Sequence, residues 1–290
     1  MNRRRFLTLT AAALFPAPGH AASVTEWQGT GLGTALSLRL IGADPHHARR
    51  TFARVEAEIA RIEGLASLHC DSALTRLNRD GRLAWPAPGF LDLLTLAGKV
   101  HAATQGVFDP TIQPLWLATA TGGDPEAARE LIGWTRLRLS PEEVRLDHGQ
   151  ALTLNGIAQG WAADRIADLL RAQGFTDALI DMGEIVALGR GPDGSDWTAH
   201  ILAPDGTPLG EARLRNRALA TSSPRGTLIG PGLPHIVGPK GEVPQWQTVS
   251  VSAPRAAVAD ALSTAFCLMD RPTIEATLTC FPEARVETRV

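Results

Sequence analysis

The hydrophobic positions of this chain predict helices and strands in separate blocks. Apolar residues at spacings of three and four predict amphipathic helices over 46–65, 90–105, 161–173 and 256–269, and shorter ones over 126–132 and 273–280. Alternating or short continuous apolar runs predict strands over 35–40, 177–188, 198–202, 210–214, 218–221, 249–252 and 285–289. Because the helices lie between groups of strands, the pattern favours an α+β fold with antiparallel sheets flanked by helices.

Irregular stretches interrupt this pattern. Residues 106–111 contain an Asp-Pro-Thr sequence typical of a turn, and residues 71–78 form a short polar and apolar stretch that a turn at 79–81 closes. Residues 152–160 form a glycine-containing turn before the helix at 161–173. Such a turn presents backbone N–H groups to an anion, but the sequence is neither GxGxxG nor a P-loop, and on this evidence alone a tight strand-to-helix turn is the favoured interpretation.

Composition narrows the class of protein. The chain has 290 residues and a net charge of −2, so it lacks the basic character of a general nucleic-acid binder. Its three cysteines are Cys70, Cys267 and Cys280, whose spacing matches no zinc or CxxC pattern. Cys267 falls in an apolar helical segment, which predicts a core position and makes a disulfide the less favoured interpretation.

The first 22 residues predict an export signal. Arg3, Arg4 and Arg5 precede the short apolar run 7–15, and small residues follow at 19–22. Two arginines followed by x-Phe-Leu resemble a twin-arginine signal, with an ordinary secretory signal as the alternative. Either reading predicts a periplasmic or otherwise exported protein whose mature chain, residues 23–290, has no membrane span.

Asp260 and Thr264 are four residues apart on one face of a predicted helix. A carboxylate and a hydroxyl are hard oxygen donors and suit magnesium. From spacing alone the alternative is structural, because Asp near a helix start complements the helix dipole and Thr often bonds to its own helix.

Five separated blocks of the sequence resemble the ApbE-type FAD:protein FMN transferases, or flavin transferases, in the same order. They are Leu32-Gly33-Thr34; Asp71-Ser72 with Leu77-Asn78; 106–111 with Pro114-Leu115; 154–164 with Gly183; and Thr221-Ser222 through His235-Ile236 to Asp260 and Thr264. The blocks cover nearly the whole mature chain. The resemblance implies an α+β fold of the family's tandem T-fold-like type, in one flavin transferase domain over 23–290.

The resemblance also implies a reaction. FAD and a magnesium ion bind in a cleft, a threonine or serine hydroxyl of a target redox flavoprotein attacks the FMN-side phosphorus, and AMP leaves. Asp260, Thr264 and the backbone carbonyl of Gly156 match the family's metal ligands, and His235 matches its proton acceptor. The positions that match the FAD pocket are Leu32, Val107, Phe108, Asp109, Thr153 and Gln159.

Several residues depart from the family pattern. The motif His-Ile-x-Asp-Pro has Gly238 in place of Asp, Thr153 replaces an acidic residue, Gln159 replaces a lysine, and Glu184 replaces an Asp. These departures keep two alternatives open beside the transferase. One is a periplasmic FAD-binding protein of the same fold without transferase activity, and the other is an FAD diphosphatase that gives FMN and AMP.

Overall fold

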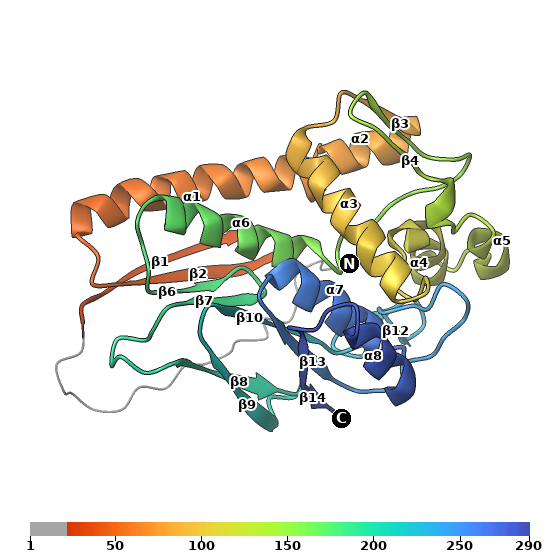
Figure 1. The fold of residues 1–290 in the computed structure, drawn as a ribbon. Helices are drawn as coiled ribbons and strands as arrows, with labels where there is room; N and C mark the ends of the chain where they lie inside the picture. Colours follow the sequence, from red (N-terminus) through yellow and green to blue (C-terminus); the bar gives the residue numbers. More distant parts are fainter. Residues whose placement is uncertain (1–21) are drawn as a thin grey trace.

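A seven-stranded antiparallel sheet forms the centre of the computed structural model, which describes residues 22–290 (Figure 1). Its strands, in spatial order, are β1 (Val24–Gly31), β2 (Thr34–Ile41), β6 (Ala178–Asp181), β7 (Ile185–Leu188), β10 (Arg217–Ser222), β13 (Val249–Ala253) and β14 (Arg285–Arg289). This sheet confirms the predicted α+β class, and β14 is an edge strand as predicted. The predicted export signal lies, apart from its last residue, outside the described residues.

Three helices cover one face of the sheet, as Figure 1 shows. They are α1 (Pro45–Ala66), α6 (Ala158–Ala172) and α7 (Ala256–Phe266). Their apolar stripes and the inward residues of the strands form the main core, in which Val55, Ile166 and Leu262 are fully buried. A second apolar cluster lies beneath β7 and β10, where the hairpin of β8 (Trp197–Leu202) and β9 (Pro208–Leu214) packs.

The strand β1 was not expected from the sequence, because its apolar and polar positions alternate only weakly. It pairs along its whole length with β2, from Val24 opposite Ile41 to Gly31 opposite Thr34. The two-residue turn between them has φ values of 53° at Leu32 and 80° at Gly33, as a type I′ hairpin requires. Leu32 is an unusual residue for this conformation, and its strain points to a role beyond the turn.

The remaining elements form a lobe beside the sheet and short segments near its edge (Figure 1). The lobe contains α2 (Ala73–Asp80), β3 (Arg82–Ala84), α3 (Pro88–Ala103), α4 (Gln113–Thr121), α5 (Pro125–Arg129), β4 (Arg138–Leu139) and β5 (Glu143–Arg145), with 3-10 turns at Pro110–Ile112 and Trp134–Arg136. The segments are β11 (Leu228–Ile229), β12 (Leu233–Pro234) and α8 (Arg271–Leu278).

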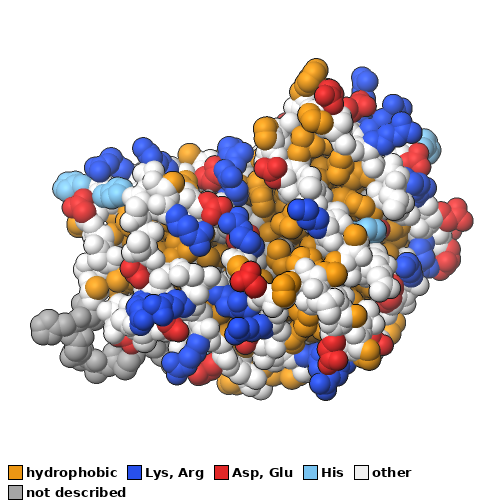
Figure 2. Space-filling model, in the orientation of Figure 1, with side chains coloured by type: hydrophobic (Ala, Val, Ile, Leu, Met, Phe, Trp, Pro, Cys, Tyr) orange, Lys and Arg blue, Asp and Glu red, His pale blue; other side chains and the backbone are white. Residues whose placement is uncertain are grey.

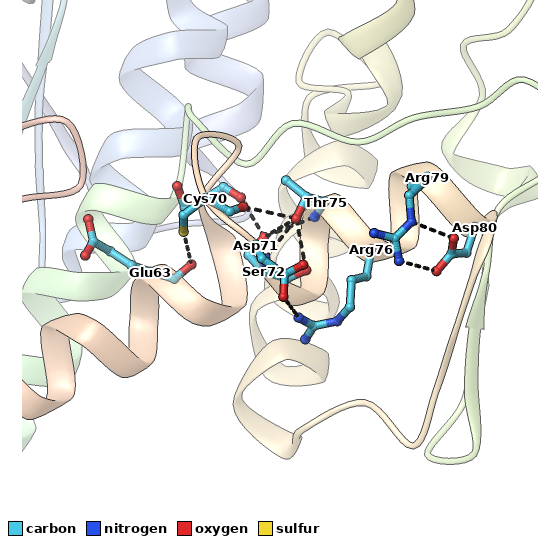
Figure 3. Close-up of polar contacts among 9 residues, drawn as sticks. Glu63, Cys70, Asp71, Ser72, Thr75, Arg76, Arg79 and Asp80 are labelled. Carbon is cyan, nitrogen blue, oxygen red and sulfur yellow. Dashed lines mark hydrogen bonds and ion pairs between the residues drawn. The ribbon is translucent and has the colours of Figure 1, made fainter.

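The structure corrects the prediction for residues 71–81. Residues 73–80 form the helix α2 rather than a short stretch closed by a turn at 79–81, and Gly81, at φ 69°, adopts the left-handed conformation that ends the helix. Ser72 and Thr75 form a capping box: the Ser72 hydroxyl accepts from the Thr75 amide at 3.0 Å, and Thr75 Oγ1 accepts from the Ser72 amide at 2.8 Å (Figure 3). The signal was present in the sequence but used threonine where glutamate is usual.

The structure shows the state of the cysteines and the character of the helices among the described residues. All three cysteines are free thiols; Cys267 is buried, as predicted, while Cys70 and Cys280 are exposed. Between residues 22 and 290, no helix combines the length and the apolar character needed to cross a bilayer.

Candidate functional site

Helices α6 and α7 stabilise each other's first turns. The Asp164 carboxylate of α6 accepts from the amides of Ala256 and Ala257 at 2.8 and 3.0 Å, which caps the start of α7. In return, Oδ2 of Asp260 in α7 accepts from the amide of Gly160, in the first turn of α6, at 3.0 Å. The two helices therefore meet at their N-terminal ends, where a carboxylate of each helix accepts from backbone N–H groups of the other.

Asp260 is only 3% exposed and carries a perturbed carboxyl group. Its pKa is raised to about 7, chiefly by burial; the hydrogen bond from Gly160 lowers the pKa, and the charge of Asp164 adds to the rise. Its second oxygen, Oδ1, makes no hydrogen bond to any described residue. A buried carboxylate in this state gains from a cation beside it.

The other two predicted metal ligands lie beside each other. A Cβ built on Gly156 would lie 3.2 Å from both Oγ1 and Cγ2 of Thr264 and 3.4 Å from Cε2 of Phe108. The close contact disfavours any side chain at position 156. Thr264 and Asp260 are one helical turn apart in α7, so the structure brings Gly156, Thr264, Asp260 and Phe108 together at the start of α6.

The chemistry of these donors fits magnesium. A carboxylate, a hydroxyl and a backbone carbonyl are hard oxygen ligands, and magnesium commonly binds one or two carboxylates and completes its shell with water and phosphate oxygens. Within the described part of the chain, no group of three or more His, Cys, Asp or Glu side chains forms a self-sufficient metal site. The donor set therefore suits an ion that arrives with a phosphate ligand.

His235 follows β12 and is held in one orientation by backbone carbonyls. Its Nδ1 lies 2.9 Å from the Pro224 oxygen and 3.2 Å from the Thr227 oxygen, and since both are acceptors, Nδ1 carries the proton. Trp116 of α4 donates from Nε1 to the His235 carbonyl at 3.0 Å. Burial lowers the pKa of His235, so the neutral imidazole dominates at neutral pH. Nε2 bonds to no described residue and is available as a base.

A short segment after β10 links His235 to the predicted metal ligands. The Ser222 hydroxyl lies 3.3 Å from Thr264 Oγ1 and 2.8 Å from the Ser263 hydroxyl. Two residues further along, the Pro224 carbonyl contacts His235. The base and the oxygen cluster therefore lie at two ends of one short backbone segment.

Leu32 and Gln159 also lie together. The Leu32 amide donates to Oε1 of Glu63 at 2.9 Å, and its carbonyl accepts from Nε2 of Gln159 at 3.4 Å. The Gln159 amide group covers Gly183, where an added Cβ would lie 2.7 Å from Cδ of Gln159. Gln159 therefore joins the β1–β2 turn to the turn between β6 and β7, and its side chain contributes no charge.

The structure assigns structural contacts to two residues predicted for the FAD pocket. Oδ1 of Asp109 accepts from the Thr111 amide at 2.8 Å and from the Thr111 hydroxyl at 2.6 Å, which caps the 3-10 turn at Pro110–Ile112. The Thr153 amide donates to the Pro110 carbonyl at 2.8 Å. Val107 packs partly buried against the main core. Their contact with FAD stays a prediction.

Glu184 is a buried group that was not predicted as part of the site. It is 8% exposed, its Oε2 accepts from the Thr221 amide at 3.3 Å, and its pKa is raised well above the ordinary value by burial and by the charge of Asp260. A carboxylate near Asp260 could have been suspected from the Gly-Glu pair in the matching block. Sequence spacing alone could not show that Glu184 and Asp260 interact.

The space around Gly238 is occupied by another acidic residue. A Cβ at Gly238 would lie 2.5 Å from the backbone oxygen of Glu242 and 2.6 Å from its Oε2. The Glu242 carboxylate also accepts from the Lys240 amide at 2.7 Å. An aspartate at position 238 would therefore require the Glu242 backbone to move.

Comparison with known proteins gives a consistent result. The chain is 29% identical to the FAD:protein FMN transferase of Treponema pallidum (strain Nichols), covering 92% of this chain and 88% of that protein. It is 25% identical to the protein of the same name from Escherichia coli (strain K12), covering 91% and 86%. Among solved structures, the apo form of Pseudomonas stutzeri flavinyl transferase ApbE superposes with a TM-score of 0.79 at 24% identity, covering 92% and 91%.

The family model agrees in extent with the described fold. The model of the ApbE family matches residues 32–286, from the β1–β2 turn to the last strand, β14. All the site residues described above fall within this range. Because the match includes most of the chain, the protein belongs to the ApbE family.

Proposed function

We propose that this protein transfers FMN from FAD to a threonine or serine hydroxyl of a target protein, with release of AMP. Support comes from membership of the ApbE family and from relatives whose names state FAD:protein FMN transferase. The target is a redox flavoprotein, and the predicted signal favours an exported or membrane protein that meets this chain outside the cytoplasm.

One observation carries the proposal: a fixed, neutral histidine base and an oxygen-rich cluster suited to a cation lie at two ends of the segment after β10. The base is His235, with its free Nε2, and the oxygen cluster is formed by Asp260, Thr264 and Gly156 at the start of α6. Transfer of a phosphoryl group requires a proton acceptor near the attacking hydroxyl and positive potential near the departing phosphate.

The proposed step breaks one bond and forms one. The target hydroxyl oxygen bonds to the phosphorus on the FMN side of the FAD diphosphate, and its proton passes to Nε2 of His235. The bond from this phosphorus to the bridging oxygen breaks, and the oxygen leaves with AMP. The Pro224 and Thr227 carbonyls keep the proton on Nδ1 at the start, so Nε2 is the site that accepts.

Asp260, Thr264 and the Gly156 carbonyl would hold a magnesium ion against the diphosphate. Magnesium bound there supplies positive charge to the phosphate oxygens. The backbone N–H groups at the start of α6 add the positive end of the helix dipole. Leu32, held in a strained turn by Glu63 and Gln159, and Phe108 beside Gly156 would bound the flavin side of the pocket.

The test combines binding and product measurements on the purified protein. Incubation with FAD, magnesium and a fragment of a candidate flavoprotein should give a fluorescent flavin band on a denaturing gel and free AMP in equal amounts. AMP without a fluorescent band would indicate an FAD diphosphatase. FAD binding without AMP would indicate a flavin-binding protein that does not transfer FMN.

Two variants separate the proposed roles. His235→Gln should retain FAD binding and lose AMP release, because only the base is removed. Asp260→Asn should lose the magnesium-dependent part of FAD binding as well, because the buried charge is removed. If both variants transfer FMN at the wild-type rate, this assignment of the site is wrong.

A further inference from the structure

Three arginines stand in register across the small sheet β3–β5–β4. Arg82 lies opposite Arg145, and Arg145 lies opposite Arg138. Directly opposite residues of an antiparallel pair share a face, with Cβ atoms about 4.5–5.5 Å apart, and like charges in this position repel. The sheet therefore holds three positive charges side by side at an electrostatic cost that its own packing does not require.

The arginines point away from the core. Val144, which precedes Arg145 in β5, is fully buried, and Leu83, which follows Arg82 in β3, packs against the main core. Since side chains alternate along a strand, the arginines occupy the opposite face, where all three are exposed. Figure 2 shows Lys and Arg side chains gathered at the upper right, where β3 and β4 lie in Figure 1.

Direct ion pairs do not hold the arginines of this row. Among residues 22–290, none of Arg82, Arg138 and Arg145 forms an ion pair with an acidic side chain, although the partly buried Glu143 shares their face and the charge of Arg82 acts on the Asp80 carboxylate, whose pKa is lowered mainly by its hydrogen bond with Arg79. The arginines of the neighbouring helix α2 behave differently, as Figure 3 shows: Arg76 pairs with Asp71 at 2.9 Å and Arg79 pairs with Asp80 at 2.8 Å.

An exposed tryptophan follows the row directly. Trp85 comes after β3, is 77% exposed, and has a positive φ of 49°, which is uncommon for a bulky residue. Its amide donates to the Glu142 carbonyl at 2.8 Å, which holds the backbone at this position. The connection from β3 to α3, which carries Trp85, runs along the uppermost part of the molecule in Figure 1.

We propose that Arg82, Arg138, Arg145 and Trp85, here called the basic edge, dock on an anionic lipid surface. A row of cations with an exposed indole at an outer edge suits the headgroup region, where tryptophan concentrates and each basic residue is attracted to anionic lipid. The net charge of −2 argues against nucleic acid as the partner. This inference does not depend on the proposed transfer reaction.

Vesicle sedimentation tests the proposal with the chain of residues 22–290, which contains every described element. The wild type should bind vesicles rich in phosphatidylglycerol, bind pure phosphatidylcholine much less, and dissociate as salt is raised. Replacing Arg82, Arg138 and Arg145 together with Gln should lower the partition coefficient on the order of 100-fold, because each arginine contributes about five-fold. Trp85→Ser should weaken binding further.

A matched control removes three other arginines with the same change of net charge. Arg171, Arg190 and Arg215 line a surface cavity of about 430 Å³ between the end of α6 and the β9–β10 turn. Replacing these with Gln should leave vesicle binding nearly intact. Equal loss in both triple variants, or no vesicle binding by the wild type, would overturn the proposal, as would binding to polyglutamate but not to lipid.

The two proposals of function fail separately. FMN transfer to a soluble acceptor fragment should proceed at the wild-type rate in the basic-edge variants, whose melting temperatures should equal or slightly exceed that of the wild type because the repulsion between arginines is relieved. Loss of transfer with intact vesicle binding would contradict the proposed reaction alone. Loss of vesicle binding in the wild type, with transfer retained, would contradict the basic edge alone.

Discussion

Gly160→Ala tests whether the close contact of α6 and α7 builds the site. A Cβ on Gly160 would lie 2.3 Å from the Ala256 carbonyl oxygen, 2.6 Å from the Ala256 carbonyl carbon and 2.8 Å from Cα of Ala257. These atoms are backbone, so they cannot turn aside as a flexible side chain does. Alanine at this position therefore requires the start of α7 to move away from α6.

Opposing effects decide the size and sign of the change in stability. Alanine in a helix is favoured over glycine by about 1 kcal/mol. Overpacking costs about 1–3 kcal/mol. Movement of α7 also weakens the bonds from Ala256 and Ala257 to Asp164, and loss of such a cap costs about 1 kcal/mol. The net destabilisation is about 1–3 kcal/mol, which lowers the melting temperature by roughly 2–6 °C in a protein of this size.

Thermal unfolding of Gly160→Ala and Gly64→Ala provides the assay and its control. Gly64 lies inside α1, and a Cβ built there meets nothing within 4 Å. Helix propensity then acts alone, and Gly64→Ala should raise the stability by about 0.5–1 kcal/mol. If Gly160→Ala is stabilised to the same extent as Gly64→Ala, the α6–α7 contact does not restrict the residue at position 160 and the reasoning fails.

Three further predictions follow from the contacts of individual side chains. NMR titration, with His235→Gln to assign the signal, should show His235 as the Nδ1–H tautomer with a pKa below 6.5, and an Nε2–H tautomer would contradict this. Because the pKa of His235 is lowered in the folded state, the stability it contributes is complete above pH 6.5 and is lost as the pH falls through the folded pKa. Asp260→Asn should keep or raise the melting temperature above pH 7, since it removes a charge from a buried position, whereas a large drop would mean that the Gly160 bond outweighs burial. Asp109→Ala should cost about 1–2 kcal/mol in urea unfolding because the Thr111 cap is lost, and an unchanged midpoint would return Asp109 to a ligand-binding role alone.

Periodicity in the sequence was enough to predict the large elements. The stripe of Val55, Ile59 and Ile62 predicts α1 because one helical face must be buried, and the structure buries these residues. The edge strand 285–289 was predicted with its observed bounds. The ordered motif blocks also led to the family, because each block keeps a few residues whose types the site requires.

Local sequence patterns did not predict an element where the pattern was weak or was compatible with more than one structure. The helix α2 begins with a capping box that uses Thr75, and β1 alternates without strong apolar residues, so neither stood out. The Asp109 and Thr111 pair is a local motif that the sequence displays. The sequence assigned Asp109 to the FAD pocket, and only the structure showed that its carboxylate bonds to Thr111.

Only the tertiary structure decided how distant segments combine into a site. Asp260 and Gly160 are 100 positions apart, Trp116 and His235 are 119 apart, and Gln159 and Leu32 are 127 apart. A repeating pattern records which face of an element is buried, but it does not record which element covers that face. The raised pKa values of Asp260 and Glu184 depend on that covering, because desolvation comes from neighbours that the chain brings together only on folding.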